Sequence, residues 1–121
     1  MNQVFNNERP IYIQLIDKIR IDIVSGKLKA SERLPSVRDL ALTSKVNPNT
    51  IQKALMELEK EGLIYTESTN GKYVTENKKL IESIKKRIAK DNASKYLKEM
   101  DNIGISYEDA IRCLQEIGGI K

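Results

Sequence analysis

The chain of 121 residues contains no histidine and only one cysteine, Cys113. Without histidine, neither histidine acid–base catalysis nor a histidine-ligated metal site is available to it. A single cysteine cannot form a disulfide within the chain, and we interpret Cys113 as a small apolar helix residue in a reducing compartment. The sequence therefore predicts no catalytic residue, no metal site and no cofactor.

Long apolar runs are also missing from the sequence. No stretch approaches the roughly 20 apolar residues of a membrane span. The first ten residues, MNQVFNNERP, lack the basic segment and apolar run of a signal peptide. We therefore expect a cytoplasmic protein with no membrane partner. A composition of 40% hydrophobic and 31% charged residues is typical of a globular domain, and the net charge of +4 mildly favours an anionic partner.

Two helices are predicted before residue 45. Between Pro10 and Gly26 the apolar residues recur at spacings of three and four, which is the pattern of one helical face. Ser36-x-x-Asp39 is a variant of the capping box, in which the serine oxygen accepts a hydrogen bond from a first-turn N–H. The second helix has to end near Ser44, because another helix start follows at once.

A third helix and a hairpin follow this second start. Asn47 is the expected N-cap and Pro48 the first helical residue, after which an apolar stripe continues for about four turns. Residues 63–74 then predict two short strands joined by a turn at Asn70-Gly71. An isolated two-stranded hairpin is marginal in water, so this one should pack on the three helices.

Residues 77–118 predict two more helices, the second of them opened by another capping-box variant, Ser106-x-x-Asp109. Two helices cannot enclose a stable core alone, because too little surface is removed from water at that size. We hypothesise that the apolar face of this tail packs on a second copy, although each residue could instead pack on the first helix of its own chain. The dimerisation candidates are Ile81, Ile84, Ile88, Leu97, Ile111, Leu114 and Ile117.

A short helix, a tight turn, a longer helix and a hairpin are the parts of a winged helix-turn-helix. In that fold the second of the two helices enters the major groove of DNA. Asparagine and glutamine can hydrogen-bond adenine edges, and lysine can reach guanine or a phosphate. The candidates at the start of the third helix are Asn49, Thr50, Gln52 and Lys53.

The predicted fold class is mainly α with a small β-hairpin. A winged helix-turn-helix occupies residues 1–75, and a short two-helix dimerisation tail occupies residues 76–121.

From the residues alone, two other classes of function stay open: an adaptor that binds proteins through an apolar patch, and an enzyme, which would need a convergent set of titratable groups. In the tail, Tyr96, Met100 and Tyr107 could line a small apolar site or simply pack in a core.

Two segments resemble a known family. GKLKASERLPSVRDLA, followed by VNPNTIQKALMELEKEGLI, resembles the GntR family of bacterial transcription regulators, and the likeness covers roughly residues 9–75. The short tail further resembles the YtrA subfamily, which lacks the larger effector-binding domain of its relatives. The resemblance implies a homodimeric repressor that binds a pseudo-palindromic operator in double-stranded DNA, often that of an ABC-transporter operon. It names no effector.

The resemblance also implies which residues contact DNA. They are Ser36 and Arg38 in the second helix, Asn47, Asn49 and Thr50 in the third, and Gly71 in the hairpin.

This sequence departs from the family in three places. Ala30-Ser31 stands where Pro-Gly is usual before the LPS segment. Lys45 stands where glycine is usual, and a left-handed conformation there would cost on the order of 1 kcal/mol. Glu67 stands where relatives tend to have a basic residue, which leaves Lys72 as the cationic candidate of the hairpin.

Overall fold

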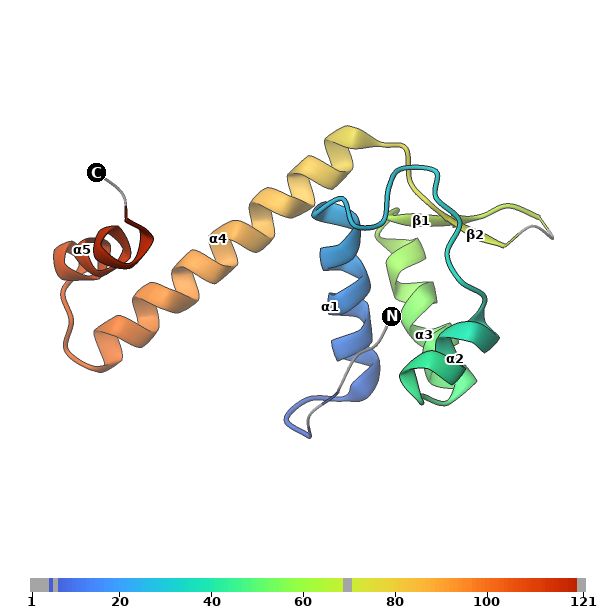
Figure 1. The fold of residues 1–121 in the computed structure, drawn as a ribbon, viewed down its shortest axis with the longest axis horizontal. Coiled ribbons are helices and arrows are strands. Elements are labelled where there is room, and N and C mark those ends of the chain that lie inside the picture. Colours follow the sequence, from blue (N-terminus) through green and yellow to red (C-terminus); the bar gives the residue numbers. More distant parts are fainter. Residues whose placement is uncertain (1–4, 6, 69–70, 120–121) are drawn as a thin grey trace. The chain divides into compact units, whose positions relative to one another are not determined.

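The computed structural model describes residue 5, residues 7–68 and residues 71–119. Within these ranges the chain is mainly helical with one antiparallel hairpin, as predicted (Figure 1). The elements in chain order are α1 (Ile11–Val24), α2 (Val37–Ser44), α3 (Pro48–Lys60), β1 (Ile64–Thr66), β2 (Lys72–Val74), α4 (Lys78–Asn102) and α5 (Tyr107–Gly118).

The two strands pair in one register, with Ile64 opposite Val74 and Thr66 opposite Lys72. The predicted turn of this hairpin falls partly outside the described residues, since Asn70 is not among them. Ile64 and Val74 are both almost fully buried. The hairpin therefore packs on the helices through its end next to α3, as a short two-stranded sheet requires.

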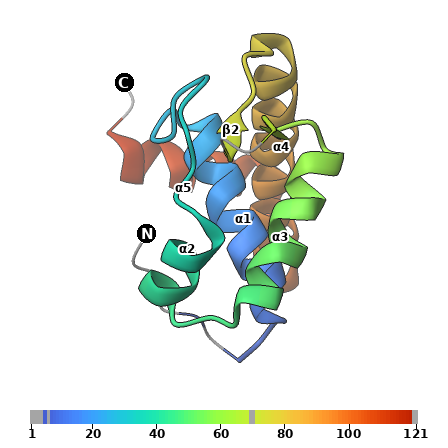
Figure 2. The same cartoon turned by 90° about the vertical axis from the view of Figure 1, so that its right-hand side faces the viewer.

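Chain contacts divide the molecule into two compact units, one ending at Ile84 and one beginning at Lys85, so that the division falls inside α4. In the first unit α1 and α3 lie side by side, and α2 crosses near the start of α3 (Figures 1 and 2). The most deeply buried large side chains come from every element of this unit up to β2 and from the loop before β1. They are Leu15, Ile19, Leu40, Ile51, Leu55, Leu58, Leu63, Ile64 and Val74.

An ion-pair network fastens α1 to the end of α3. The Arg20 guanidinium donates to both carboxylate oxygens of Glu61, at 3.0 Å from Nε to Oε1, and to Asp17 at 2.7 Å. The hydrogen bond to Glu61 is the main reason that the pKa of Arg20 is raised. This contact joins α1 to the C-terminal end of α3, whereas α2 lies near the N-terminal end of α3.

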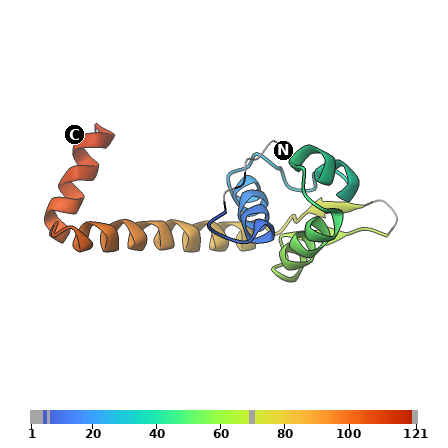
Figure 3. The ribbon, with the colours of Figure 1, turned by 90° about the horizontal axis from the view of Figure 1, so that it is seen from below.

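In the second unit α5 crosses the end of α4 (Figure 3). Ser106 caps α5 by accepting a hydrogen bond from the Asp109 N–H at 3.2 Å, as predicted. The Tyr96 hydroxyl donates to the Ala110 carbonyl at 2.6 Å, and Ala110 is fully buried. Tyr96 therefore acts as a packing residue between the two helices, whereas Tyr107 is exposed.

Candidate nucleic-acid interface

The turn between α2 and α3 is fixed by backbone and capping interactions. The Ser36 hydroxyl oxygen accepts from the Asp39 N–H at 3.0 Å, and the Asn47 Oδ1 accepts from the Asn49 N–H at 2.8 Å. Lys45, which stands where the family usually has glycine, ends α2 in the left-handed conformation, with φ 57° and ψ 41°. The two helices thus meet in the geometry of a helix-turn-helix.

One face of α3 is buried and the other is exposed. Ile51, Leu55 and Leu58 lie in the core, while Asn49 and Gln52 are exposed at the start of the helix. The N–H groups of the first turn and the helix dipole favour an anion at this end. The exposed face of α3 therefore begins with hydrogen-bonding side chains next to a positive helix end.

The remaining predicted residues of the two helices differ in their surroundings. Ser36 and Arg38 are exposed at the start of α2, and Thr50 is half-buried. The Lys53 ammonium lies over the ring of Tyr12, 3.8 Å from its centroid, which draws this side chain toward α1. A cation–π contact of this kind stabilises by about 0.5–1 kcal/mol at an exposed site. Lys53 is thus the one member of this group held to another helix by its charge.

Lys72, the predicted cation of the hairpin, is already paired. Its ammonium donates to Glu59 Oε1 on α3 at 2.8 Å and to the Thr66 hydroxyl on β1 at 2.8 Å. The hydrogen bond from Lys72 is the main cause of a lowered Glu59 pKa, with a further contribution from Thr66. The three side chains fasten the hairpin to α3. The positive charge of Lys72 is therefore paired with a carboxylate of the protein itself.

A hollow of about 260 Å³, lined by both polar and apolar residues, lies between the hairpin and the two helices. It brings together four of the predicted residues from three parts of the chain. Its polar lining includes Ser36, Gln52, Gly71 and Lys72, which sequence reasoning selected, and Arg33 and Thr66, which it missed. Arg33 immediately precedes the Leu34-Pro35 pair. Neighbouring side chains of an extended segment point to opposite sides, so the apolar Leu34 was the one sign in the sequence that Arg33 points outward.

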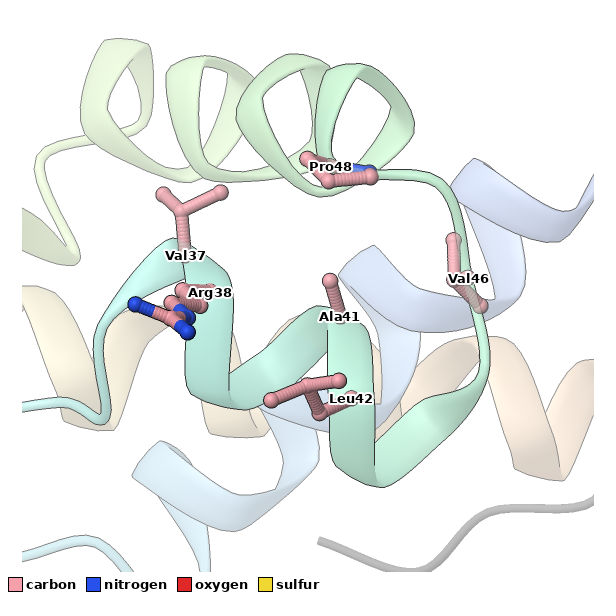
Figure 4. A pocket seen from close by; sticks show the side chains of 6 residues that line it. All are labelled: Val37, Arg38, Ala41, Leu42, Val46 and Pro48. Carbon is pink, nitrogen blue, oxygen red and sulfur yellow. The ribbon is translucent and has the colours of Figure 1, made fainter.

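A second, apolar hollow of about 480 Å³ lies along the helix-turn-helix itself (Figure 4). Val37 and Ala41 on α2 face Pro48 on α3 across it, and Leu42 forms its outer side. Arg38 flanks the hollow with its guanidinium turned away from α3 (Figure 4). The polar helix starts are thus bordered by an apolar surface that can take a methyl or other small apolar group.

The dimerisation candidates divide by exposure in the single chain. Ile84 is buried within the first unit, whereas Leu114 is 48% exposed and Ile117 is 86% exposed on α5. The other four candidates, Ile81, Ile88, Leu97 and Ile111, are half-buried. The exposed apolar surface of the second unit is thus concentrated on α5 and the loop before it, where Ile103 and Tyr107 add to it.

The part of the chain that the structure describes contains no metal-binding cluster and no membrane-spanning helix. No group of three or more cysteine, aspartate or glutamate side chains there could hold a metal ion. None of the helices in these ranges is both long enough and apolar enough to cross a bilayer. The polar surface around α2, α3 and the hairpin is therefore the candidate functional site.

Comparison with known proteins gives a consistent result. The model of the family "Bacterial regulatory proteins, gntR family" matches residues 11–74, which contain all of α1, α2, α3 and the hairpin. The HTH-type transcriptional repressor YtrA of Bacillus subtilis is 36% identical over 110 residues, covering 89% of this chain and 84% of YtrA. The likeness to YtrA thus includes the tail as well as the helix-turn-helix.

Solved structures agree with this comparison. A GntR family transcriptional regulator from Listeria monocytogenes is 41% identical, has a TM-score of 0.87, and is similar over 93% of this chain and 98% of that one. The DNA-binding domain of AraR, solved in complex with operator ORX1, is 27% identical with a TM-score of 0.56 over 60% of this chain and 93% of that domain. The chain belongs to the gntR family of bacterial regulatory proteins and is a DNA-binding transcriptional regulator of the YtrA-like type, not an enzyme.

Proposed function

We propose that the protein is a homodimeric repressor that binds a pseudo-palindromic operator through α2, α3 and the hairpin. The observation that carries this proposal is the pair of capped helix starts, which present exposed polar side chains beside one another. The proposed contacts are Ser36 and Arg38 from α2, Asn47, Asn49, Thr50, Gln52 and Lys53 from α3, and Gly71 and Lys72 from the hairpin.

Each proposed contact follows from the chemistry of its side chain. Arg38 can hold a guanine edge or a phosphate with two parallel hydrogen bonds, and Asn49 can pair with an adenine. Ser36 keeps its hydroxyl hydrogen free to donate to a phosphate, because its oxygen accepts from Asp39. Lys53 is exposed and its ammonium lies over the Tyr12 ring, so we assign it a phosphate contact and not a base contact.

A dimer doubles this set of contacts on two successive major grooves. We propose that residues 1–75 bind DNA and that residues 76–121 join two copies. The apolar surface of α5 supports this division, since exposed apolar patches commonly mark interfaces between chains.

The dimer is tested by charging the exposed apolar face of α5. The double variant Leu114→Asp, Ile117→Asp changes side chains that are exposed in the single chain, so each subunit should still fold. Sedimentation velocity should then show monomers at concentrations where the unaltered protein is dimeric. The matched control is Leu42→Asp, an equally apolar side chain that is 70% exposed in the first unit, and it should leave the dimer intact. A double variant that stays dimeric would contradict the assignment of the tail.

Repression is proposed because YtrA, which this chain resembles over most of its length, is named a repressor. We further propose that the regulated genes include an ABC-transporter operon and that the protein acts in the cytoplasm, where promoter DNA is accessible.

Footprinting on the protein's own promoter and on adjacent transporter promoters should protect a site with two-fold symmetry. Deleting the gene should raise transcription from that promoter. Protection of random sequences as well as the candidate site, or a fall in transcription, would contradict the proposal.

A further inference from the structure

Arg33 lies in the segment that links α1 to α2, and this segment runs along β2. The Leu34 N–H donates to the Lys72 carbonyl at 2.8 Å, and Arg33 itself pairs with Tyr73 as an isolated antiparallel bridge. Successive side chains of an extended segment point to opposite sides. Because Leu34 is buried, Arg33 is turned to the exposed side of the hairpin.

The Arg33 guanidinium lies against Gly71. A Cβ atom on Gly71 would come within 3.1 Å of the Arg33 Nε and 3.4 Å of its Nη2, and the positive φ of 107° at Gly71 also disfavours any side chain. The lack of a side chain at position 71 therefore makes room for the guanidinium. A planar group resting on the backbone is partly ordered before a ligand arrives, so less side-chain entropy is lost on binding.

Arg33 differs from Lys72 in how its charge is used. Lys72 is paired with Glu59, whereas none of the ion pairs formed among the described residues involves Arg33. Arg33 is exposed, while the Lys72 side chain is only 21% exposed. Arg33 is thus the cation at this hairpin that can bind an anion without first giving up a carboxylate partner.

We propose that Arg33 binds a phosphate of the DNA backbone at the hollow between the hairpin, α2 and α3. This inference rests on the proposed function and deepens it, because it assigns the cationic contact of the hairpin to a residue outside the hairpin. The hollow offers further donors in Ser36 and Gln52. A guanidinium matches the geometry of a phosphate with two parallel hydrogen bonds. Such a contact positions the protein on the duplex without reading its sequence.

The test measures the salt dependence of DNA binding for the full chain. Fluorescence anisotropy with an operator duplex and with a scrambled duplex of equal length gives the affinity at several KCl concentrations. Each lost phosphate contact lowers the slope of log affinity against log salt by about 0.9, so Arg33→Gln in a dimer should lower it by nearly 2. The affinity at low salt should fall by the same factor, tenfold or more, on both duplexes. Arg33→Lys should keep most of the slope.

The matched control is Lys27→Gln, which removes the same charge from an exposed side chain of the same connecting segment outside the hollow. It should retain the original slope. If Arg33→Gln binds with the slope and affinity of Lys27→Gln while the unaltered protein prefers the operator, the Arg33 proposal is wrong and the proposed function stands. If the unaltered protein binds both duplexes equally, the proposed function fails, and the slope still decides whether Arg33 contacts phosphate.

Discussion

Replacing Lys45 by glycine should stabilise the protein. Lys45 holds a left-handed conformation between α2 and α3, which costs a residue with a Cβ atom about 1–2 kcal/mol. Glycine removes that cost but loses about 0.5–1 kcal/mol more backbone entropy on folding. The net gain in the free energy of unfolding should therefore be about 0.5–1 kcal/mol. For a unit of this size, that is a rise in melting temperature of about 2–8 °C.

The assay is urea unfolding followed by circular dichroism, with thermal melting as a second reading. Lys45→Ala is the matched control, because alanine also loses the lysine charge but keeps the Cβ atom and hence the conformational cost. Alanine should leave the midpoint nearly unchanged while glycine raises it. Equal midpoints for the glycine and alanine variants would refute the argument that backbone conformation, and not the charge of Lys45, sets the stability of this turn.

Three further outcomes are expected. Leu55→Ala should lower the free energy of unfolding by about 2–5 kcal/mol in urea titration, because it empties a fully buried position on α3. Glu59→Gln should make the protein less sensitive to acid: the Glu59 pKa is lowered from its ordinary 4.5, so its stabilisation is present above that value and is lost as the pH falls through the lowered pKa. Urea midpoints at pH 7 and pH 3 should therefore differ less for this variant than for the unaltered chain. Asn47→Ala should cost about 1 kcal/mol of stability, read from thermal melting, because the Asn49 N–H loses its cap.

The local parts of the site could be predicted from the sequence, because capping acts over two to four residues. Ser36 and Asn47 accept the hydrogen bonds that their positions predicted. Periodicity likewise predicted the buried face of α3. In these places the sequence signal and the structural cause lie in the same few residues.

Contacts between distant residues could not be predicted in this way. Nothing in the pattern around Lys72 indicates that Glu59 neutralises it, and nothing around Gly71 indicates that Arg33 covers it. The same holds for Ile84, because its place in an apolar stripe predicts burial but not the element against which it packs. Such pairings depend on how the segments cross in three dimensions, which periodicity does not encode.

In the proposed complex, the starts of α2 and α3 read the operator. The most direct test of this recognition is the affinity of Arg38→Ala and Asn49→Ala for the footprinted operator and for a scrambled duplex at one fixed salt concentration. Each variant should lose about 1–3 kcal/mol on the operator and much less on the scrambled duplex, because a base contact carries sequence information. Unchanged operator affinity for both variants would contradict this recognition geometry.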